Sequence, residues 1–156
     1  MILVLLVISI LLEGILTNLL SGFIFFFAIA DIVLLCNFSP NKNYYVYIFI
    51  LGICYDLFYT SFIFLHGFIF IFLYYLNKKM FKEKNEYIKR LFIYLLSTAI
   101  YILIMIIVTT NYNNYNFYII INMFLNSLVF NIIYFSLSNF VIKNMFCNRR
   151  KIKTYK

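Results

Sequence analysis

The chain has 156 residues, of which 65% are hydrophobic and 12% charged, and its mean hydropathy is +0.96. Water-soluble domains are about 45 to 50% apolar, so this composition excludes a soluble globular protein and predicts an all-α integral membrane protein. The net charge of +8 does not indicate a nucleic-acid partner, because the basic residues cluster beside apolar segments, where they determine membrane topology.

The length predicts a compact bundle with short connections, since about 20 residues suffice for one membrane-spanning helix. The first apolar stretch has neither the basic start nor the cleavage pattern of a removable signal peptide, so it is expected to stay attached. The six predicted spans of this single domain, 1–156, cover residues 2–20, 23–38, 44–59, 62–76, 91–109 and 117–141. A basic loop, 77–90, and a basic tail, 142–156, lie beside them.

Basic residues predict the orientation of the bundle. If the loop 77–90 and the tail 142–156 both face the cytoplasm, an even number of spans must separate them, and the fifth and sixth spans do so. Counting backward places both termini in the cytoplasm and leaves the turns 20–22, 60–62 and 111–116 outside, where no Lys or Arg occurs. A five-span arrangement, in which the first stretch does not cross, is the alternative.

Three carboxylates interrupt the apolar spans: Glu13 in the first, Asp31 in the second and Asp56 in the third. A charge at the centre of a lipid-facing helix costs about 2.5 to 3.5 kcal/mol on insertion scales, so all three are expected to face protein or water. The topology places Glu13 and Asp56 in the outer half of the bundle, with Asp56 close to the outer face, and Asp31 near mid-membrane. No Lys or Arg lies in these spans to pair with them.

Small and polar residues mark candidate helix contacts. Gly52 precedes Asp56 by four residues and so shares its helix face, where the missing side chain allows a close approach. Gly67 has the same potential near the start of the fourth span. On the sixth span one face carries Ser127, Asn131, Tyr134 and Ser138, at spacings of four, three and four. This stripe predicts packing within the bundle or docking of another membrane protein.

Catalytic patterns are absent from the sequence. It contains no HExxH or GxSxG motif, and its single histidine, His66, has no Ser, Cys or acid at a spacing that suggests a dyad. His66 is therefore interpreted as a structural residue. Cys36, Cys54 and Cys147 lack metal-binding spacing and are expected to be reduced thiols. We expect no enzyme activity, no cofactor and no metal.

Residues 22–80 resemble the bacterial rod shape-determining protein MreD family. The resemblance rests on Asp31 at an early acidic position, on the Gly-x-x-x-Asp motif of Gly52 and Asp56, and on Gly67 at the following glycine position. It implies a non-enzymatic scaffold of the cell-elongation complex in the inner membrane, which supports lateral peptidoglycan synthesis and cell shape. The implied partners are the lipid bilayer, an MreC-like membrane protein, the elongation transpeptidase and glycosyltransferase, and indirectly an actin-like filament.

The alternative is a substrate-capture subunit, like the S components of energy-coupling-factor vitamin transporters. Such subunits have this length and a polar cavity that faces outward, which Glu13, Asp31 and Asp56 are able to line. The sequence has few Gly or Ala residues and lacks the small-residue helix faces by which those subunits dock. The scaffold interpretation is therefore preferred, and no small-molecule substrate is expected.

Overall fold

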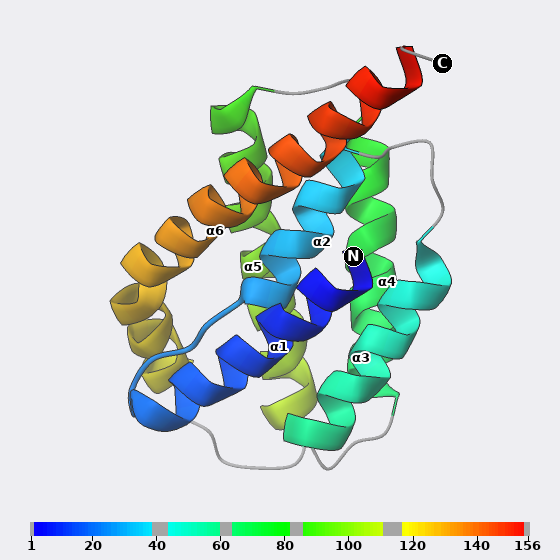
Figure 1. Ribbon diagram of the computed structural model, residues 1–156. Coiled ribbons are helices and arrows are strands. Elements are labelled where there is room, and N and C mark those ends of the chain that lie inside the picture. Colours follow the sequence, from blue (N-terminus) through cyan, green and yellow to red (C-terminus); the bar gives the residue numbers. More distant parts are fainter. Residues whose placement is uncertain (1, 39–43, 60–63, 82–85, 111–116, 155–156) are drawn as a thin grey trace.

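The computed structural model describes residues 2–38, 44–59, 64–81, 86–110 and 117–154. These residues form helices joined by short connections, with no strand among them, so the predicted all-helical class is confirmed. The helices are α1 (Ile2–Leu19), α2 (Phe27–Phe38), α3 (Tyr45–Tyr59), α4 (Leu65–Met80), α5 (Tyr87–Thr110) and α6 (Phe117–Thr154), arranged as one bundle (Figure 1).

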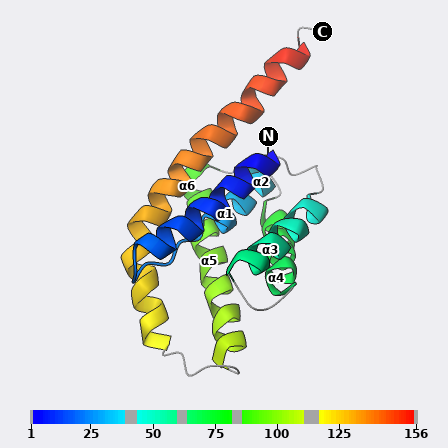
Figure 2. The same ribbon diagram turned by 60° about the horizontal axis from the view of Figure 1, so that its bottom comes forward.

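Two helices are long and apolar enough to cross a membrane. They contribute the stretches Tyr87–Val108, of 22 residues, and Ile121–Asn144, of 24 residues. Beyond its apolar stretch α6 continues as a helix to Thr154, and its C-terminal end projects from the bundle (Figure 2). The predicted sixth span, 117–141, is therefore only part of this helix. Hydropathy marks the end of an apolar stretch, whereas Lys and Arg are good helix formers and prolong the helix.

The short helix α2 forms the centre of the bundle. All of its 12 residues are buried, and it packs against α1, α4, α5 and α6. Figure 1 shows it enclosed by longer helices. A helix that is apolar all round belongs in an interior, which explains why the segment Ala28–Cys36, with Asp31 as its one charged residue, takes this place.

The second predicted span, 23–38, is helical only from Phe27. Residues 23–26 precede the helix without helical structure, after a turn in which Gly22 has a positive φ of 94°. A helix of 12 residues is about 18 Å long, and four extended residues add about 13 Å. Hydropathy alone does not distinguish such a broken segment from a continuous helix.

The remaining helix ends also differ from the prediction. Helix α4 starts at Leu65 and includes Lys78 and Lys79, and α5 starts at Tyr87, so both helices extend into the predicted loop 77–90. The predicted turns 60–62 and 111–116 lie outside the described residues. Gly67 is the third residue of α4, close to the helix start as predicted.

Large apolar side chains occupy the outside of the bundle as well as its core. On the outside they include Val46, Phe68 and Leu137, which are 69%, 66% and 62% exposed. The buried polar set comprises Ser9, Glu13, Asp31, Asn37, Asp56, His66, Asn77, Ser97, Thr98, Ser127, Asn131 and Ser138. Extensive exposed apolar surface marks a face that binds protein or lipid, and here it surrounds the described bundle.

Candidate functional site

Asp56 and His66 form a buried pair at the junction of α3 and α4. His66 Nδ1 hydrogen-bonds Asp56 Oδ1 at 2.6 Å, and the backbone N–H of His66 donates to Asp56 Oδ2 at 2.9 Å. On its other side, His66 Nε2 lies 2.8 Å from the hydroxyl oxygen of Tyr101 on α5. We call Asp56, His66 and Tyr101 the Asp56 cluster. Its carboxylate satisfies a donor in the first turn of α4, where the N-cap residue Phe64 makes no side-chain cap.

The Asp56 cluster corrects two expectations from the sequence. His66 does have an acidic partner, because the end of α3 packs against the start of α4. Asp56 is only 1% exposed, so burial and hydrogen bonds replace the expected access to water. The signal that sequence reasoning missed is the location of an acid in the last turn of one helix and a histidine in the first turn of the next.

Gly52 and Gly67 bring α3 and α4 together. A Cβ atom at Gly52 would overlap the backbone of Gly67 and lie 2.6 Å from the carbonyl carbon of His66. At Gly67, a Cβ atom would lie 2.9 Å from the Phe49 ring. The predicted close contact is thus internal to the hairpin of α3 and α4, and it positions His66 beside Asp56.

Glu13 accepts a backbone hydrogen bond at the start of α2, as Asp56 does at the start of α4. Its Oε2 accepts a hydrogen bond of 3.2 Å from the backbone N–H of Ala28, in the first turn of α2. Its Oε1 accepts one of 2.9 Å from the Tyr55 hydroxyl on α3. A carboxylate is favourable at a helix N-terminus, where backbone N–H groups lack partners and the helix dipole is positive.

Tyrosine hydroxyls lie between the two carboxylates. The Tyr101 hydroxyl contacts His66 and the Tyr55 hydroxyl donates to Glu13. The two tyrosines also interact electrostatically, so they lie between His66 and Glu13. The sequence predicted that these acids face the interior, but not the aromatic residues that lie between them.

The polar stripe of α6 faces α2 and the segment before it. Asn131 accepts a hydrogen bond of 2.9 Å from the Phe26 N–H and donates one of 3.1 Å to the Ile24 carbonyl oxygen. It donates another of 3.1 Å to the Ser127 hydroxyl. The stripe thus supplies partners for the Ile24 carbonyl oxygen and the Phe26 N–H in the segment before α2, and these groups are used inside the bundle.

Asp31 meets the C-terminal half of the same stripe. The Tyr134 hydroxyl donates to Asp31 Oδ2 at 3.2 Å, whereas the buried Oδ1 has no hydrogen-bond partner among the described residues. Asp31 is thereby tied to α6, whereas Glu13 bonds α2 and α3 and Asp56 bonds α4. The three acids lie in one interior but do not share one cavity.

Two of the hollows between the helices are lined by residues that the structure describes. A groove of about 450 Å³ lies between α1 and α6, and its lining is largely apolar. A smaller pocket of about 300 Å³ lies between α1 and α3, with Glu13 and Tyr55 in its lining. The residues that the structure describes include no cluster of three or more His, Cys, Asp or Glu residues able to hold a metal ion.

Cys36 and Cys54 are free thiols. The Cys36 Sγ donates to the Tyr74 carbonyl oxygen at 3.6 Å in the interior. The side chain of Cys147 lies outside the part that is described.

No protein-family model, curated protein or solved structure matches this chain.

Proposed function

We propose that the chain is a multi-pass protein of the bacterial inner membrane that crosses the bilayer six times, with both termini in the cytoplasm. The apolar exterior and the internally paired polar groups support this proposal, because lipid offers no hydrogen bonds to a helix end or an extended segment. Residues 23–38 reach across as an extended stretch followed by α2, with Asn131 and Glu13 supplying the hydrogen bonds that lipid cannot.

We further propose a non-enzymatic scaffold role of the MreD kind, in which the bundle docks an MreC-like membrane protein. Through that partner it supports the transpeptidase and glycosyltransferase that build the lateral wall and, indirectly, an actin-like filament. The residues that carry the resemblance to the MreD family, Gly52, Asp56 and Gly67, build the hairpin of α3 and α4. They stabilise the scaffold, so the docking surface has to lie elsewhere.

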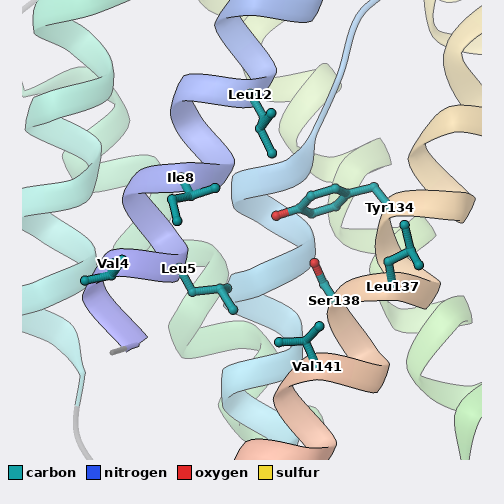
Figure 3. Close-up of a pocket in the computed structure, with 8 residues that line it drawn as sticks. All are labelled: Val4, Leu5, Ile8, Leu12, Tyr134, Leu137, Ser138 and Val141. Atoms are coloured by element: carbon teal, nitrogen blue, oxygen red, sulfur yellow. The ribbon is translucent and has the colours of Figure 1, made fainter.

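The groove between α1 and α6 is the observation that carries this proposal. Figure 3 shows side chains of both helices facing each other across α2. The lining residues are Val4, Leu5, Ile8, Leu12, Tyr134, Leu137, Ser138 and Val141. In a membrane, a partner helix that fills this groove gains packing contacts, which drive helix association in lipid. The hydroxyls of Tyr134 and Ser138 add polar atoms to one wall.

Filling the groove tests the docking role. Leu137→Trp places a bulky side chain in the groove, whereas Leu125→Trp makes the same change at another exposed site of α6 outside the groove lining. We expect Leu137→Trp to weaken co-purification with the MreC-like partner about tenfold, equivalent to about 1.4 kcal/mol, and Leu125→Trp to leave it unchanged. Equal recovery of the partner with both variants would exclude the groove as the docking surface.

The pocket between α1 and α3 favours a second candidate function, capture of a small molecule in the manner of a transporter S component. Thr17, Asn18 and Tyr59 are exposed, and they join Glu13 in its lining, so the pocket is both polar and accessible. A stoichiometric small molecule retained through purification and identified by mass spectrometry would favour capture over the scaffold role.

A further inference from the structure

The pocket between α1 and α3 is lined largely by polar side chains. It is lined by Glu13, Gly14, Thr17, Asn18, Tyr55 and Tyr59. The side chain of Tyr59 occupies the space that Gly14 leaves open, since a Cβ atom at Gly14 would overlap the Tyr59 ring. The glycine therefore allows the Tyr59 hydroxyl to reach the α1 backbone and form one wall.

The three hydroxyl groups of this lining all use their protons inside the protein. Thr17 donates to the Glu13 carbonyl oxygen at 2.7 Å, and Tyr59 donates to the Ile10 carbonyl oxygen at 2.9 Å. Tyr55 donates to Glu13 Oε1 at 2.9 Å. A hydroxyl has one proton and two lone pairs, so these groups have only acceptor capacity left for a ligand.

Glu13 keeps acceptor capacity in this pocket and lacks a basic neighbour in the described part of the chain. It is 5% exposed, and its Oε2 accepts a hydrogen bond from the Ala28 N–H and its Oε1 one from the Tyr55 hydroxyl, although a carboxylate oxygen accepts two. Across the described residues the acid–base pair within 4.0 Å is His66 with Asp56, and Glu13 has no Lys or Arg beside it. A ligand that donates hydrogen bonds and carries positive charge would complement Glu13 and the neighbouring hydroxyls.

We propose that this pocket binds a protonated organic amine, with Glu13 as its counter-ion. The N–H groups of the ligand meet Glu13, Thr17 and Tyr59, and its body lies against the aromatic rings of Tyr55 and Tyr59, whose centroids are 4.9 Å apart. The pocket volume of about 300 Å³ suits a small organic cation, whereas a bare metal ion would leave most of this volume empty. The inference deepens the capture function and rests on it, not on the scaffold role.

Matched probes test the charge and the donor requirement. Benzylammonium, benzyl alcohol and benzyltrimethylammonium share one ring but differ in charge and in N–H donors. Their binding is measured by titration calorimetry of the full chain in lipid nanodiscs, with empty nanodiscs subtracted. We expect benzylammonium to bind at least about tenfold more tightly than benzyl alcohol, and the quaternary cation to bind more weakly than benzylammonium because it has no N–H group.

Substitutions assign the binding to this pocket. Glu13→Gln is expected to remove the preference for the cation, and Thr17→Val and Tyr59→Phe each to weaken benzylammonium binding severalfold. Tyr47→Phe, at an exposed position of α3 outside the pocket, serves as the control and is expected to bind as the parent does. Thermal unfolding of each variant identifies any loss of fold, and Thr17→Val provides a test that leaves the Glu13 cap of α2 in place.

The outcomes separate the ligand class from the capture function. If benzylammonium and benzyl alcohol bind with equal affinity, and Tyr59→Phe removes the binding of both, the amine inference is overturned. The pocket would then still capture small molecules. Absence of binding by all three probes would overturn the amine inference as well, and an unrelated molecule found by mass spectrometry would then keep the capture function. Binding unaffected by Glu13→Gln and Thr17→Val would place the amine elsewhere and contradict the proposal.

Discussion

At the starts of two helices in this bundle, a backbone N–H group donates to a carboxylate from a neighbouring helix. Glu13 of α1 accepts the Ala28 N–H of α2, and Asp56 of α3 accepts the His66 N–H of α4. In water a solvent molecule can take this role, but in a lipid-embedded interior an unpaired backbone N–H costs several kcal/mol. The two acids are therefore explained as structural groups that complete helix ends, and Glu13 alone also lines an open pocket.

Replacement of Asp56 tests its structural role. Asp56→Leu removes the partners of His66 Nδ1 and of the His66 backbone N–H, and we expect the free energy of unfolding to fall by about 3 to 5 kcal/mol. Asp56→Asn keeps one oxygen acceptor, so its loss should be smaller, about 1 to 3 kcal/mol. Reversible unfolding in mixed detergent micelles measures both. A Leu variant as stable as the parent would show that the pair contributes nothing to the fold.

At the level of single residues, the sequence predicted which groups lie inside but not their partners. Glu13, Asp31 and Asp56 are buried as the cost of a charge in lipid requires. The pairing of Asp56 with His66 depends on how α3 packs against α4, and hydropathy contains no information on that packing. The glycines Gly52 and Gly67 were recognisable because only their size permits the close contact.

Helix α2 is held at both ends as well as along its sides. In the N-terminal turn of α2, the Ala28 N–H donates to the Glu13 carboxylate. At the C-terminal end of α2, Asn37 Oδ1 accepts a hydrogen bond of 3.2 Å from Arg90 Nη1. The Arg90 guanidinium also lies 4.9 Å from the centroid of the Phe38 ring. Negative charge at the start and positive charge at the end both complement the helix dipole, which stabilises a helix that is too short to cross a membrane alone.

The stability of the segment before α2 depends on its hydrogen bonds to Asn131 of α6. Asn131→Leu removes the acceptor of the Phe26 N–H and the donor to the Ile24 carbonyl oxygen, so two backbone groups lose their partner. We expect the free energy of unfolding to fall by about 2 kcal/mol. Asn126→Leu, the same change at an exposed position of the same helix, should change stability by less than about 0.5 kcal/mol.

Unfolding of both Asn variants in the same detergent measures this difference. Equal stability of the two would mean that residues 23–26 do not depend on α6. The periodicity of the polar stripe predicted either packing within the bundle or docking of another membrane protein, and in the structure Ser127, Asn131 and Ser138 are buried. It was insufficient to predict that Asn131 serves an extended segment, because apolar composition is the same in an extended and a helical stretch.

At the scale of the whole molecule, buried polar groups are surrounded by an apolar surface. The structure contains two helices that are long and apolar enough to cross a membrane, and α1, α2 and α3 add shorter apolar helices. Composition alone predicted the helical class, because 65% hydrophobic residues leave no soluble alternative. The number of crossings and the side of each terminus remain proposals that follow from the distribution of basic residues.

Cysteine labelling in intact bacterial cells tests this six-crossing arrangement most directly. In a background without Cys36, Cys54 and Cys147, single cysteines are placed in a tag before residue 1, at Ser21 or at Lys143. A membrane-impermeant maleimide is then added before or after permeabilisation. The arrangement predicts labelling of Ser21→Cys in intact cells, and of the tag and Lys143→Cys only after permeabilisation. Labelling of the tag in intact cells would leave five crossings and contradict the account.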